Sequence, residues 1–539
     1  MNVARATLPA HLAGALALVA FFGATLPYLG SFPLIGQDEP WIAAPAAKLA
    51  TQGVYGDDLF AGYYGMEQRA YNFPPLFPLA EALAFRALGV GVWPARLVAV
   101  LCGAATLLLT YALGRRLFGG GVAALAAWLL IGLRLAYEHD ASGVPLLDLA
   151  RIARYDMAVP PLVLAALLCL VWAEQRGAGW RYVLSGALAG LATLAHLYGG
   201  FVLPIMGALL LWRGGPGLVR RPAPYLLALG CALALLPWAL YIAQAPGLYA
   251  GQMLPEQARF RLWEPAFYLQ SLLREPARYQ RLLFDRQGLA LWPRAGIWAA
   301  LLGLPLASGL LLWQAIARRA LAERLLLLAL PLLALQLALL VNLKFYNYIA
   351  LLLPFVALEL AWLGAGLWRA VRRWPGRWGL AGRLGLGLLL ALVLAEGALG
   401  VAQSLRRAAA TSDYAAYTRR VGAAIPAGAR VLALHQFWFG VYARGYEYRS
   451  IVLAFYLSDP AFYRPAPLPI DQALAQIAPE YLLVDQFMAP ELRFDRPAAA
   501  LEDQQRRQFR LYVEQHCGRV VAQIDDRDYG ALTVYRLCP

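Results

Sequence analysis

The feature that most constrains this chain is its series of apolar runs. A helix that crosses a hydrocarbon core of about 30 Å needs about 20 mostly apolar residues. Only 15% of the 539 residues are charged, against about 25% in soluble proteins. The sequence therefore predicts a polytopic α-helical membrane protein with about eleven transmembrane helices. The runs lie near 9–30, 94–113, 120–136, 157–173, 180–195, 197–212, 225–243, 291–313, 325–341, 346–365 and 384–402.

Arginines between these runs predict the orientation. Basic residues collect in cytoplasmic loops, so the net charge of +15 is assigned to orientation and not to nucleic-acid binding. Placing every cluster inside puts the N-terminus in the cytoplasm and the C-terminus outside. The first run is predicted to stay as a membrane helix and not to be a cleaved signal. The clusters are Arg115 with Arg116, Arg176 with Arg181, Arg213 with Arg220 and Arg221, Arg318 with Arg319 and Arg324, and Arg369 with Arg372, Arg373 and Arg377.

Residues 76–90 are apolar but short, and they contain Glu81 and Arg86. A span here would turn every later basic cluster outward. We therefore interpret them as an amphipathic helix at the outer interface, within the first outer loop. The outer loops are then 31–93, 137–156 and 244–290, and the cytoplasmic loops are too short for a nucleotide-binding domain.

The pattern changes after the last apolar run. We predict a transmembrane domain over 1–402 and a small extracytoplasmic α/β domain over 403–539, where short apolar runs alternate with polar helical stretches. Two runs, 520–525 and 531–537, predict a hairpin. Cys517 and Cys538 flank it, and a disulfide or two free thiols are both open alternatives.

Asp38 and Glu39 follow the first run, where the chain leaves the membrane. A carboxylate there is either a solvated helix end or a group that takes a proton from an acceptor hydroxyl. Two adjacent acids before a long polar and aromatic loop favour the second interpretation. Asp38 is our candidate for the general base, and Glu39 is a helper or a metal ligand.

Arg154 and Asp156 stand at the start of the fourth run, at the same predicted boundary as Asp38. Ionisable groups at a membrane edge either anchor the helix or mark a site. As a site, Asp156 supplies a second acid that orients the acceptor or a cation, and Arg154 faces a phosphate.

Lys344 is one of only two lysines, with Lys48, in a chain otherwise rich in arginine. Its compact ammonium on the outer side suits a phosphate. The alternative is a lysine that merely extends to the interface. The arginine-rich loop 244–290 adds Arg259 and Arg261 as candidates for an anionic substrate, or for lipid headgroups.

His196 precedes Gly199 and Gly200 between two apolar runs. It is either a ligand in the cavity or a structural histidine. No cofactor is required by the sequence. A divalent cation is possible, with Glu39, Asp156 or His196 as its ligands, although no zinc-spaced His/Cys cluster, nucleotide-binding loop or Gly-x-Ser-x-Gly elbow is present.

Several motifs in order resemble the membrane glycosyltransferases of the C superfamily (GT-C), in particular the protein O-mannosyltransferases and the lipid A aminoarabinose transferases. The resemblance covers roughly residues 9–365. Its motifs are Asp38-Glu39, YNFPPLF at 71–77, Arg96-Leu97, YALGRRLFG at 111–119, ARYDM at 153–157, KFYNY at 344–348 and Leu353-Pro354.

This resemblance implies a multi-span fold with an outer cavity, and transfer of a sugar from a polyprenyl-phosphate donor to an external acceptor. It implies that Asp38 is the base, with Glu39 beside it, that Asp156 is the second-loop acid, and that Lys344 contacts the donor phosphate. Further cavity residues would come from the same motifs: Tyr71, Asn72, Tyr346 and Tyr348.

The chain also departs from the pattern. Aminoarabinose transferases carry an acid and a lysine where this chain has Asn72 and Phe73, which argues against aminoarabinose as the sugar. The acceptor, whether protein, lipid or polysaccharide, is left open. We expect inverting displacement in a bacterial inner membrane, with the site on the extracytoplasmic side. The alternative is a flippase for polyprenyl-linked sugars or another lipid transporter.

Overall fold

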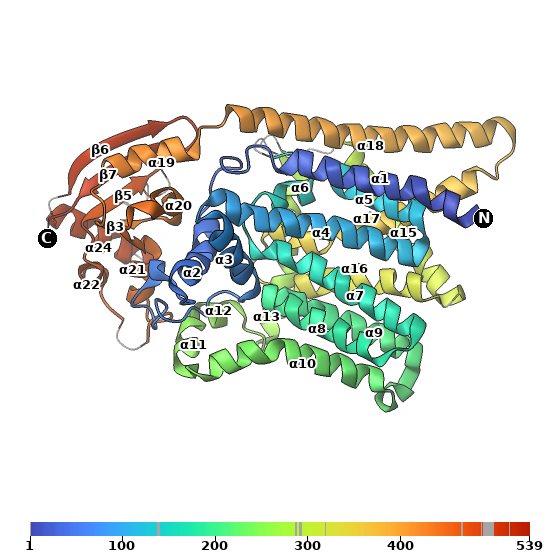
Figure 1. Cartoon of the computed structure of the whole chain (residues 1–539), viewed down its shortest axis with the longest axis horizontal. Coiled ribbons are helices and arrows are strands. Elements are labelled where there is room, and N and C mark those ends of the chain that lie inside the picture. Colours follow the sequence, from blue (N-terminus) through green and yellow to red (C-terminus); the bar gives the residue numbers. More distant parts are fainter. Residues whose placement is uncertain are drawn as a thin grey trace. The chain divides into compact units, whose positions relative to one another are not determined.

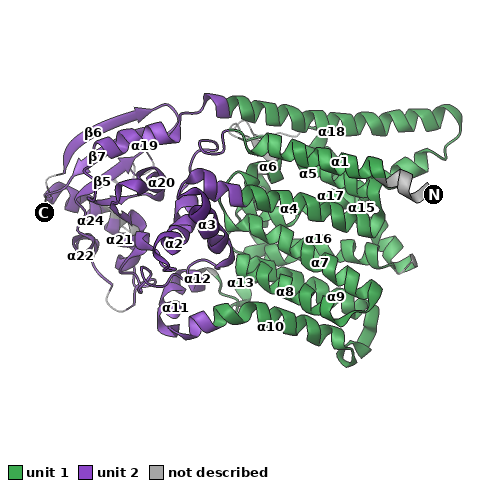
Figure 2. Cartoon of the chain, viewed as in Figure 1, with its two compact units in different colours: residues 1–27, 99–239, 260–407 green, residues 28–98, 240–259, 408–539 purple. Residues whose placement is uncertain are grey.

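The structure is a computed structural model, and it describes residues 2–136, 141–285, 288–289, 294–318, 320–464, 467–486, 488, 501–516 and 518–538. The chain divides into two compact units (Figure 2). Unit 1 comprises residues 1–27, 99–239 and 260–407, and unit 2 comprises 28–98, 240–259 and 408–539. The two are described separately.

Unit 1 is built from long apolar helices (Figure 1). Leucine and alanine dominate them, and both favour the helix. Short 3-10 helices break the chain at the ends of several helices. The α-helices are α1 (Asn2–Thr25), α5 (Gly120–Gly132), α6 (Pro145–Ala150), α7 (Val159–Arg176), α8 (Gly179–Ala195), α9 (Val202–Gly214), α13 (Pro265–Leu273), α14 (Gln280–Leu283), α15 (Ala295–Arg318), α16 (Leu321–Leu340), α17 (Leu353–Val371) and α18 (Gly376–Ala410).

Helices that extend into unit 2, and several short elements, complete this unit. Helices α4 (Val92–Phe118) and α10 (Pro222–Ala243), like α18, each begin in one unit and end in the other. Within unit 1, α7 packs on α8, α5 on α1 and α17, and α15 on α16 and α17. The shorter elements are η2 (Tyr155–Ala158), η3 (Leu197–Phe201), η4 (Gly215–Arg220), η5 (Glu275–Tyr279), η6 (Tyr346–Leu351), and the paired strands β1 (Phe284–Asp285) and β2 (Gly288–Leu289).

Eight helices in the described part of the chain are long and apolar enough to cross a membrane, against eleven predicted. The other three predicted runs, 120–136, 180–195 and 346–365, also form helices. However, α5 has 13 residues, α8 has 17, and α17 carries Glu359 and Arg369. The prediction of a mostly helical membrane domain is confirmed, and the count of eleven stays a prediction.

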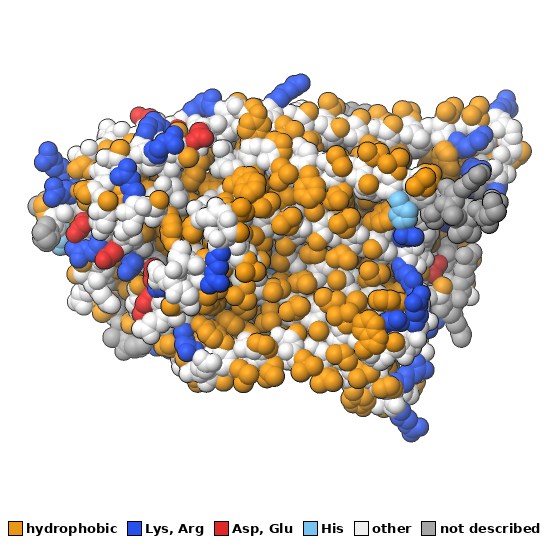
Figure 3. Space-filling model, viewed as in Figure 1, with side chains coloured by type: hydrophobic (Ala, Val, Ile, Leu, Met, Phe, Trp, Pro, Cys, Tyr) orange, Lys and Arg blue, Asp and Glu red, His pale blue; other side chains and the backbone are white. Residues whose placement is uncertain are grey.

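The outer surface of these helices is apolar. In α10, Leu229, Leu233, Leu236 and Leu240 recur every three or four residues, and each is about half exposed. Figure 3 shows hydrophobic side chains over the long helices of unit 1, with Lys and Arg gathered at the end where the N-terminus lies. Such a surface suits hydrocarbon rather than water, so the chain is an integral membrane protein.

Unit 2 contains a five-stranded sheet with the order β4-β3-β5-β7-β6. Strand β3 is parallel to β4 and β5, whereas β7 is antiparallel to β5 and β6. The predicted hairpin is confirmed as β6 and β7. Cys517 lies outside the described residues, so a disulfide with Cys538 and two free thiols both stay open. The strands are β3 (Arg430–Ala433), β4 (Glu447–Ser450), β5 (Tyr481–Asp485), β6 (Arg519–Asp526) and β7 (Gly530–Arg536).

Helices pack against this sheet around a core that includes Leu432, Leu474, Leu482 and Phe509. The sequence prediction of a C-terminal α/β region is thus confirmed as a fold, while its boundary at residue 403 stays a prediction. The elements are α19 (Tyr414–Ala423), η7 (His435–Phe437), α20 (Trp438–Val441), η8 (Tyr442–Arg444), α21 (Ile451–Ser458), α22 (Ile470–Ile477) and α24 (Leu501–Gln515).

The first loop belongs to the same unit as the sheet. Glycine 53 ends α2 in the left-handed conformation that closes many helices, and α2 packs on α3 and on η7. A helix is present where the segment 76–90 was predicted to form one, as α3, whereas its place at the membrane interface stays a prediction. The elements of this part are α2 (Asp38–Gln52), η1 (Asp58–Phe60), α3 (Leu76–Leu88), α11 (Pro246–Gln252) and α12 (Leu254–Arg259).

Candidate active site

Asp38 and Glu39 open helix α2, and the structure separates their environments. Both lie in the first turn, where the positive end of the helix dipole stabilises a carboxylate. Asp38 is exposed, whereas Glu39 is 1% exposed. Two adjacent acids of the same sequence motif therefore present one carboxylate to the surroundings and one to the interior of unit 2.

Glu39 is held by Arg96 of α4. The guanidinium donates from Nε to Oε1 at 2.7 Å and from Nη2 to Oε2 at 2.8 Å, a two-pronged geometry that only arginine provides. Arg96 also donates to the carbonyl of Leu29, and the Gly36 amide donates to Glu39. This fully buried pair ties the entry loop to α2 and so fixes where Asp38 stands. Sequence reasoning gave Arg96 no role, although an arginine inside an apolar run was a usable signal.

A second set of contacts orders the loop after α2. The Tyr71 amide donates to Gln252 Oε1 at 2.8 Å, and Gln252 Nε2 donates to the carbonyls of Tyr64 and Arg69. Asn72, beside Tyr71, has a buried side-chain amide with no hydrogen-bond partner among the described residues. Gln252 was not singled out in the sequence, because one glutamine in a polar loop carries no pattern.

Unit 1 holds the second predicted acid. Arg154 Nε donates to Asp156 Oδ2 at 2.8 Å, and His196 Nε2 lies 3.9 Å from Asp156 Oδ1. All three residues are buried. Arg154, Asp156 and His196 therefore lie together, with Arg154 directed at the acid of its own motif, and their predicted roles stay predictions.

His196 is a neutral imidazole in this cluster. Burial lowers its pKa to about 4, although Asp156 works in the opposite direction. Its Nδ1 accepts a hydrogen bond from the Tyr198 amide, which leaves the ring proton on Nε2, toward Asp156. His196 is thus a proton carrier or hydrogen-bond donor, and not a fixed positive charge for an anionic ligand.

This state predicts a pH dependence. Because the pKa of His196 is lower in the folded protein than in the unfolded one, the unfolded chain takes up the proton first as pH falls. Stability from this residue should be complete above about pH 6.5 and decline toward pH 4. We expect His196→Gln to remove part of that decline and to leave the profile between pH 7 and 9 unchanged, measured by thermal unfolding. An equal decline in the variant would contradict the assignment.

Lys344 forms a buried triad with Glu275 and Arg278. Lys344 Nζ lies 2.8 Å from Glu275 and donates to Ser271 Oγ at 3.0 Å, and Arg278 Nε donates to Glu275 at 2.8 Å. Burial lowers the pKa of Lys344, and Glu275 offsets part of this. Burial alone would raise the pKa of Glu275, but hydrogen bonds from Arg278 and Lys344 hold it below its usual value. A ligand must therefore compete with Glu275 for the ammonium.

Tyr348 joins the two clusters of unit 1. Its ring lies 4.7 Å from that of Tyr198 and 5.5 Å from that of His196, and the Arg278 guanidinium lies 5.5 Å from its centroid. Helix η2, with Asp156, also packs on η6, with Tyr348. The Asp156 and Lys344 motifs, nearly 200 residues apart in sequence, therefore meet in one place. Tyr346 begins η6 and is half-buried.

The remaining candidates are the two arginines of loop 244–290. Arg261 is exposed and pairs with Glu264 at 3.4 Å, and the Arg259 side chain lies outside the described residues. Within the described part of the chain, no group of three metal-ligating side chains occurs. The predicted cavity shared by Asp38, Asp156 and Lys344 stays a prediction, because Asp38 belongs to unit 2 and the other two to unit 1.

This chain is similar to one family model and to several solved structures. Residues 72–241 match the family model described as dolichyl-phosphate-mannose-protein mannosyltransferase. No curated protein matches the chain. Among solved structures, ArnT from Cupriavidus metallidurans in the apo state superposes with a TM-score of 0.59 at 16% identity, covering 98% of each chain. The same protein bound to undecaprenyl phosphate gives 0.57 at 16% identity, covering 97% of each.

A second protein has the same fold. The oligosaccharyltransferase of Archaeoglobus fulgidus, tethered to an acceptor peptide, gives a TM-score of 0.60 at 13% identity. The match covers 98% of this chain and 74% of that one. At such identities the likeness concerns the fold.

Proposed function

We propose that the chain is a membrane glycosyltransferase of the C superfamily, and that it transfers a sugar from a polyprenyl-phosphate donor to an acceptor outside the cytoplasm. The family match over residues 72–241 and the fold shared with ArnT and the oligosaccharyltransferase support this proposal. Asp38 takes the proton from the acceptor hydroxyl, the hydroxyl oxygen forms the new bond to the anomeric carbon, and the polyprenyl phosphate leaves with the bonding electrons. Attack opposite the leaving group inverts the anomeric centre.

The observation that carries this proposal is the difference in environment between Asp38 and Glu39 at the start of α2. A general base must be open to the acceptor, and Asp38 is exposed. Glu39 is buried and bound on both oxygens by Arg96, so it acts as a positioning residue. The fold match to ArnT bound to undecaprenyl phosphate supports a lipid-phosphate donor.

Cations around Lys344 suit the leaving phosphate. Arg274 is exposed and donates to Asn342 Oδ1 at 3.1 Å, two residues before Lys344. We assign the first contact with the phosphate to Arg274, and further contacts to the buried cations Lys344 and Arg154. Arg259 and Arg261, in the sequence segment 244–290, complete this set. Positive charge directed at the departing oxygen stabilises the transition state.

The direct test uses purified protein, undecaprenyl-phosphate mannose as donor and a bacterial envelope extract as acceptor. Sugar found in the acceptor fraction, with undecaprenyl phosphate released in equal amount, supports the proposal. Intact donor moved across a vesicle without cleavage would replace it with the transporter alternative. Analysis of the product linkage by NMR checks inversion.

Replacing Arg274 with Met should weaken donor use. A hydrogen bond to a charged group is worth about 1.5–3 kcal/mol, so we expect the KM for the donor to rise about tenfold or more. The acceptor KM should be unchanged. Arg220→Met, which removes an exposed arginine from η4, is the matched control. If both variants have the same donor KM, Arg274 has no part in phosphate binding.

A further inference from the structure

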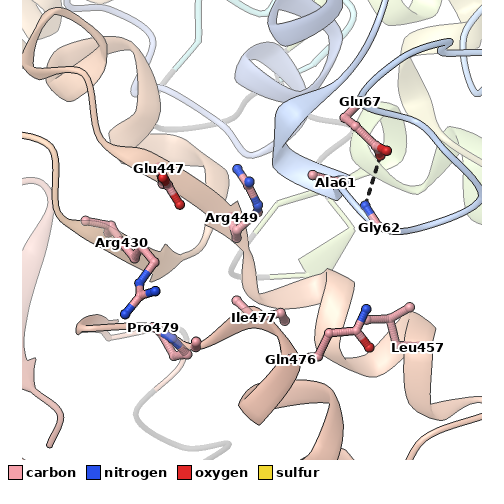
Figure 4. Close-up of a pocket in the computed structure, with 12 residues that line it drawn as sticks. Ala61, Gly62, Glu67, Arg430, Glu447, Arg449, Leu457, Gln476, Ile477 and Pro479 are labelled. Carbon is pink, nitrogen blue, oxygen red and sulfur yellow. Dashed lines mark hydrogen bonds between the residues drawn. The ribbon is translucent and has the colours of Figure 1, made fainter. Parts of the chain in front are cut away.

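A polar cavity of about 380 Å³ lies within unit 2, apart from the Asp38 carboxylate (Figure 4). This volume falls within the range of small-molecule sites, about 300–1,000 Å³. Its walls come from two distant parts of the sequence, the loop after α2 and the C-terminal sheet. The polar side chains are Glu67, Arg430, Glu447, Arg449 and Gln476, and the apolar ones include Leu457, Ile477 and Pro479.

The sheet sets the spacing of the charged groups. Glu447 and Arg449 are two residues apart on β4 and so point to the same face, and Arg430 of β3 is the register partner of Glu447. Figure 4 shows these three side chains on one side of the cavity, with Glu67 on the other. Glu67 accepts from the Gly62 amide at 2.9 Å.

Much of this polar surface is not used by the protein. Within the described residues, the Arg449 guanidinium donates to one acceptor, the Tyr448 carbonyl at 3.3 Å, and its charge also acts on the buried carboxyl of Asp57. The Glu447 carboxylate forms no ion pair among these residues. Arg430 is held by Glu480 at 3.2 Å. Ala478, on the wall, ends α22 in the left-handed conformation that closes many helices, with φ of +48° and its amide donating to the Leu474 carbonyl.

The hydrogen-bond donors and acceptors that line the cavity favour a neutral, hydroxyl-rich ligand. Two guanidinium groups and an amide donate hydrogen bonds, and two carboxylates accept them. The charges cancel, so a phosphate or another anion would meet as much repulsion as attraction. A hydroxyl both donates and accepts, and the C–H face of a sugar ring packs on apolar side chains such as Ile477 and Pro479. An extended peptide has no open strand edge here, because η1 packs against β4.

Strand β3 connects the cavity to the segment that precedes Asp38, so its length limits the distance between them. Arg430, at one end of β3, lines the cavity, and His435, just beyond the other end, contacts the carbonyl of Gln37 through Nδ1 at 3.1 Å. Five residues at about 3.3 Å each place the Cα atoms of Arg430 and His435 at most about 17 Å apart. An acceptor of several sugar units is therefore long enough to fill the cavity and reach Asp38.

We propose that this cavity is a carbohydrate subsite that holds a distal sugar of an oligosaccharide acceptor. This inference rests on the proposed function only in identifying the bound oligosaccharide as the acceptor. The binding of a neutral oligosaccharide does not depend on that function. It predicts that longer oligosaccharides are better acceptors than monosaccharides, since only they occupy the cavity and Asp38 together.

Binding is tested on the full-length protein in detergent. The first experiment uses an array of neutral and acidic oligosaccharides, with short peptides and inorganic phosphate as competitors. The second measures the best neutral oligosaccharide by saturation-transfer NMR. Arg449→Met and Glu447→Gln should each weaken binding about tenfold, whereas Arg536→Met, an exposed arginine on β7 of the same sheet, should not. Equal thermal midpoints show that each variant is folded.

The outcomes separate this inference from the proposed function. Asp38→Asn should bind the oligosaccharide as wild type does while failing to transfer sugar. In transfer assays, Arg449→Met should raise the acceptor KM for long oligosaccharides and leave kcat and the donor KM unchanged. No binding of any neutral oligosaccharide, binding of peptide or phosphate alone, or binding unaffected by both cavity variants would overturn the subsite, whatever Asp38 does.

Discussion

Asp38→Asn is expected to abolish sugar transfer while leaving the protein folded and able to bind its donor. The amide has nearly the same shape as the carboxylate but does not accept a proton. General bases contribute about 10²–10⁴-fold to rate, so we expect a loss of at least that size in kcat. The exposed position of Asp38 means that little packing is disturbed.

The matched control is Asp471→Asn, which removes another exposed carboxylate from the first turn of a helix, α22, in the same unit. Its activity should be that of wild type. Donor binding, followed by retention of undecaprenyl-phosphate mannose on the immobilised protein, should be equal in both variants. An Asp38→Asn protein that transfers sugar at the wild-type rate would remove the base from the mechanism.

Breaking the Glu39–Arg96 pair should produce the largest loss of stability. Arg96→Met leaves the Glu39 carboxylate buried and without its partner, and removing one member of a buried ion pair costs about 3–5 kcal/mol. We expect a marked fall in the thermal midpoint at a fixed scan rate, with activity lost as well because the loop that carries Asp38 is released.

A double variant distinguishes the pair from the site. Glu39→Leu with Arg96→Met replaces both charges with apolar groups of similar size, and such replacements are often neutral. It should recover most of the midpoint, and any activity it fails to recover measures how far the pair positions Asp38. Arg86→Met, at an exposed arginine of α3, should change the midpoint little. Equal midpoints for Arg96→Met and Arg86→Met would contradict the role of the pair.

The class of protein follows from the amino-acid sequence alone. Apolar runs of membrane length and the low share of charge require a helical membrane domain, because a hydrocarbon interior leaves the backbone no other partners. The return of short alternating runs predicted the C-terminal α/β region, and its hairpin appears as β6 and β7. The order of the acidic, Arg-Tyr-Asp and lysine motifs indicated the glycosyltransferase fold before any contact was known.

What each side chain does depends on contacts that form only in the folded chain. Adjacent acids such as Asp38 and Glu39 are equivalent in the sequence, and it is the approach of Arg96, 57 positions from Glu39, that buries one and leaves the other exposed. Glu275 became the partner of Lys344, and residues of the first loop became a wall of the Arg449 cavity, for the same reason. The burial and pairing of a side chain depend on which distant segments pack together, and the local sequence pattern does not indicate those contacts.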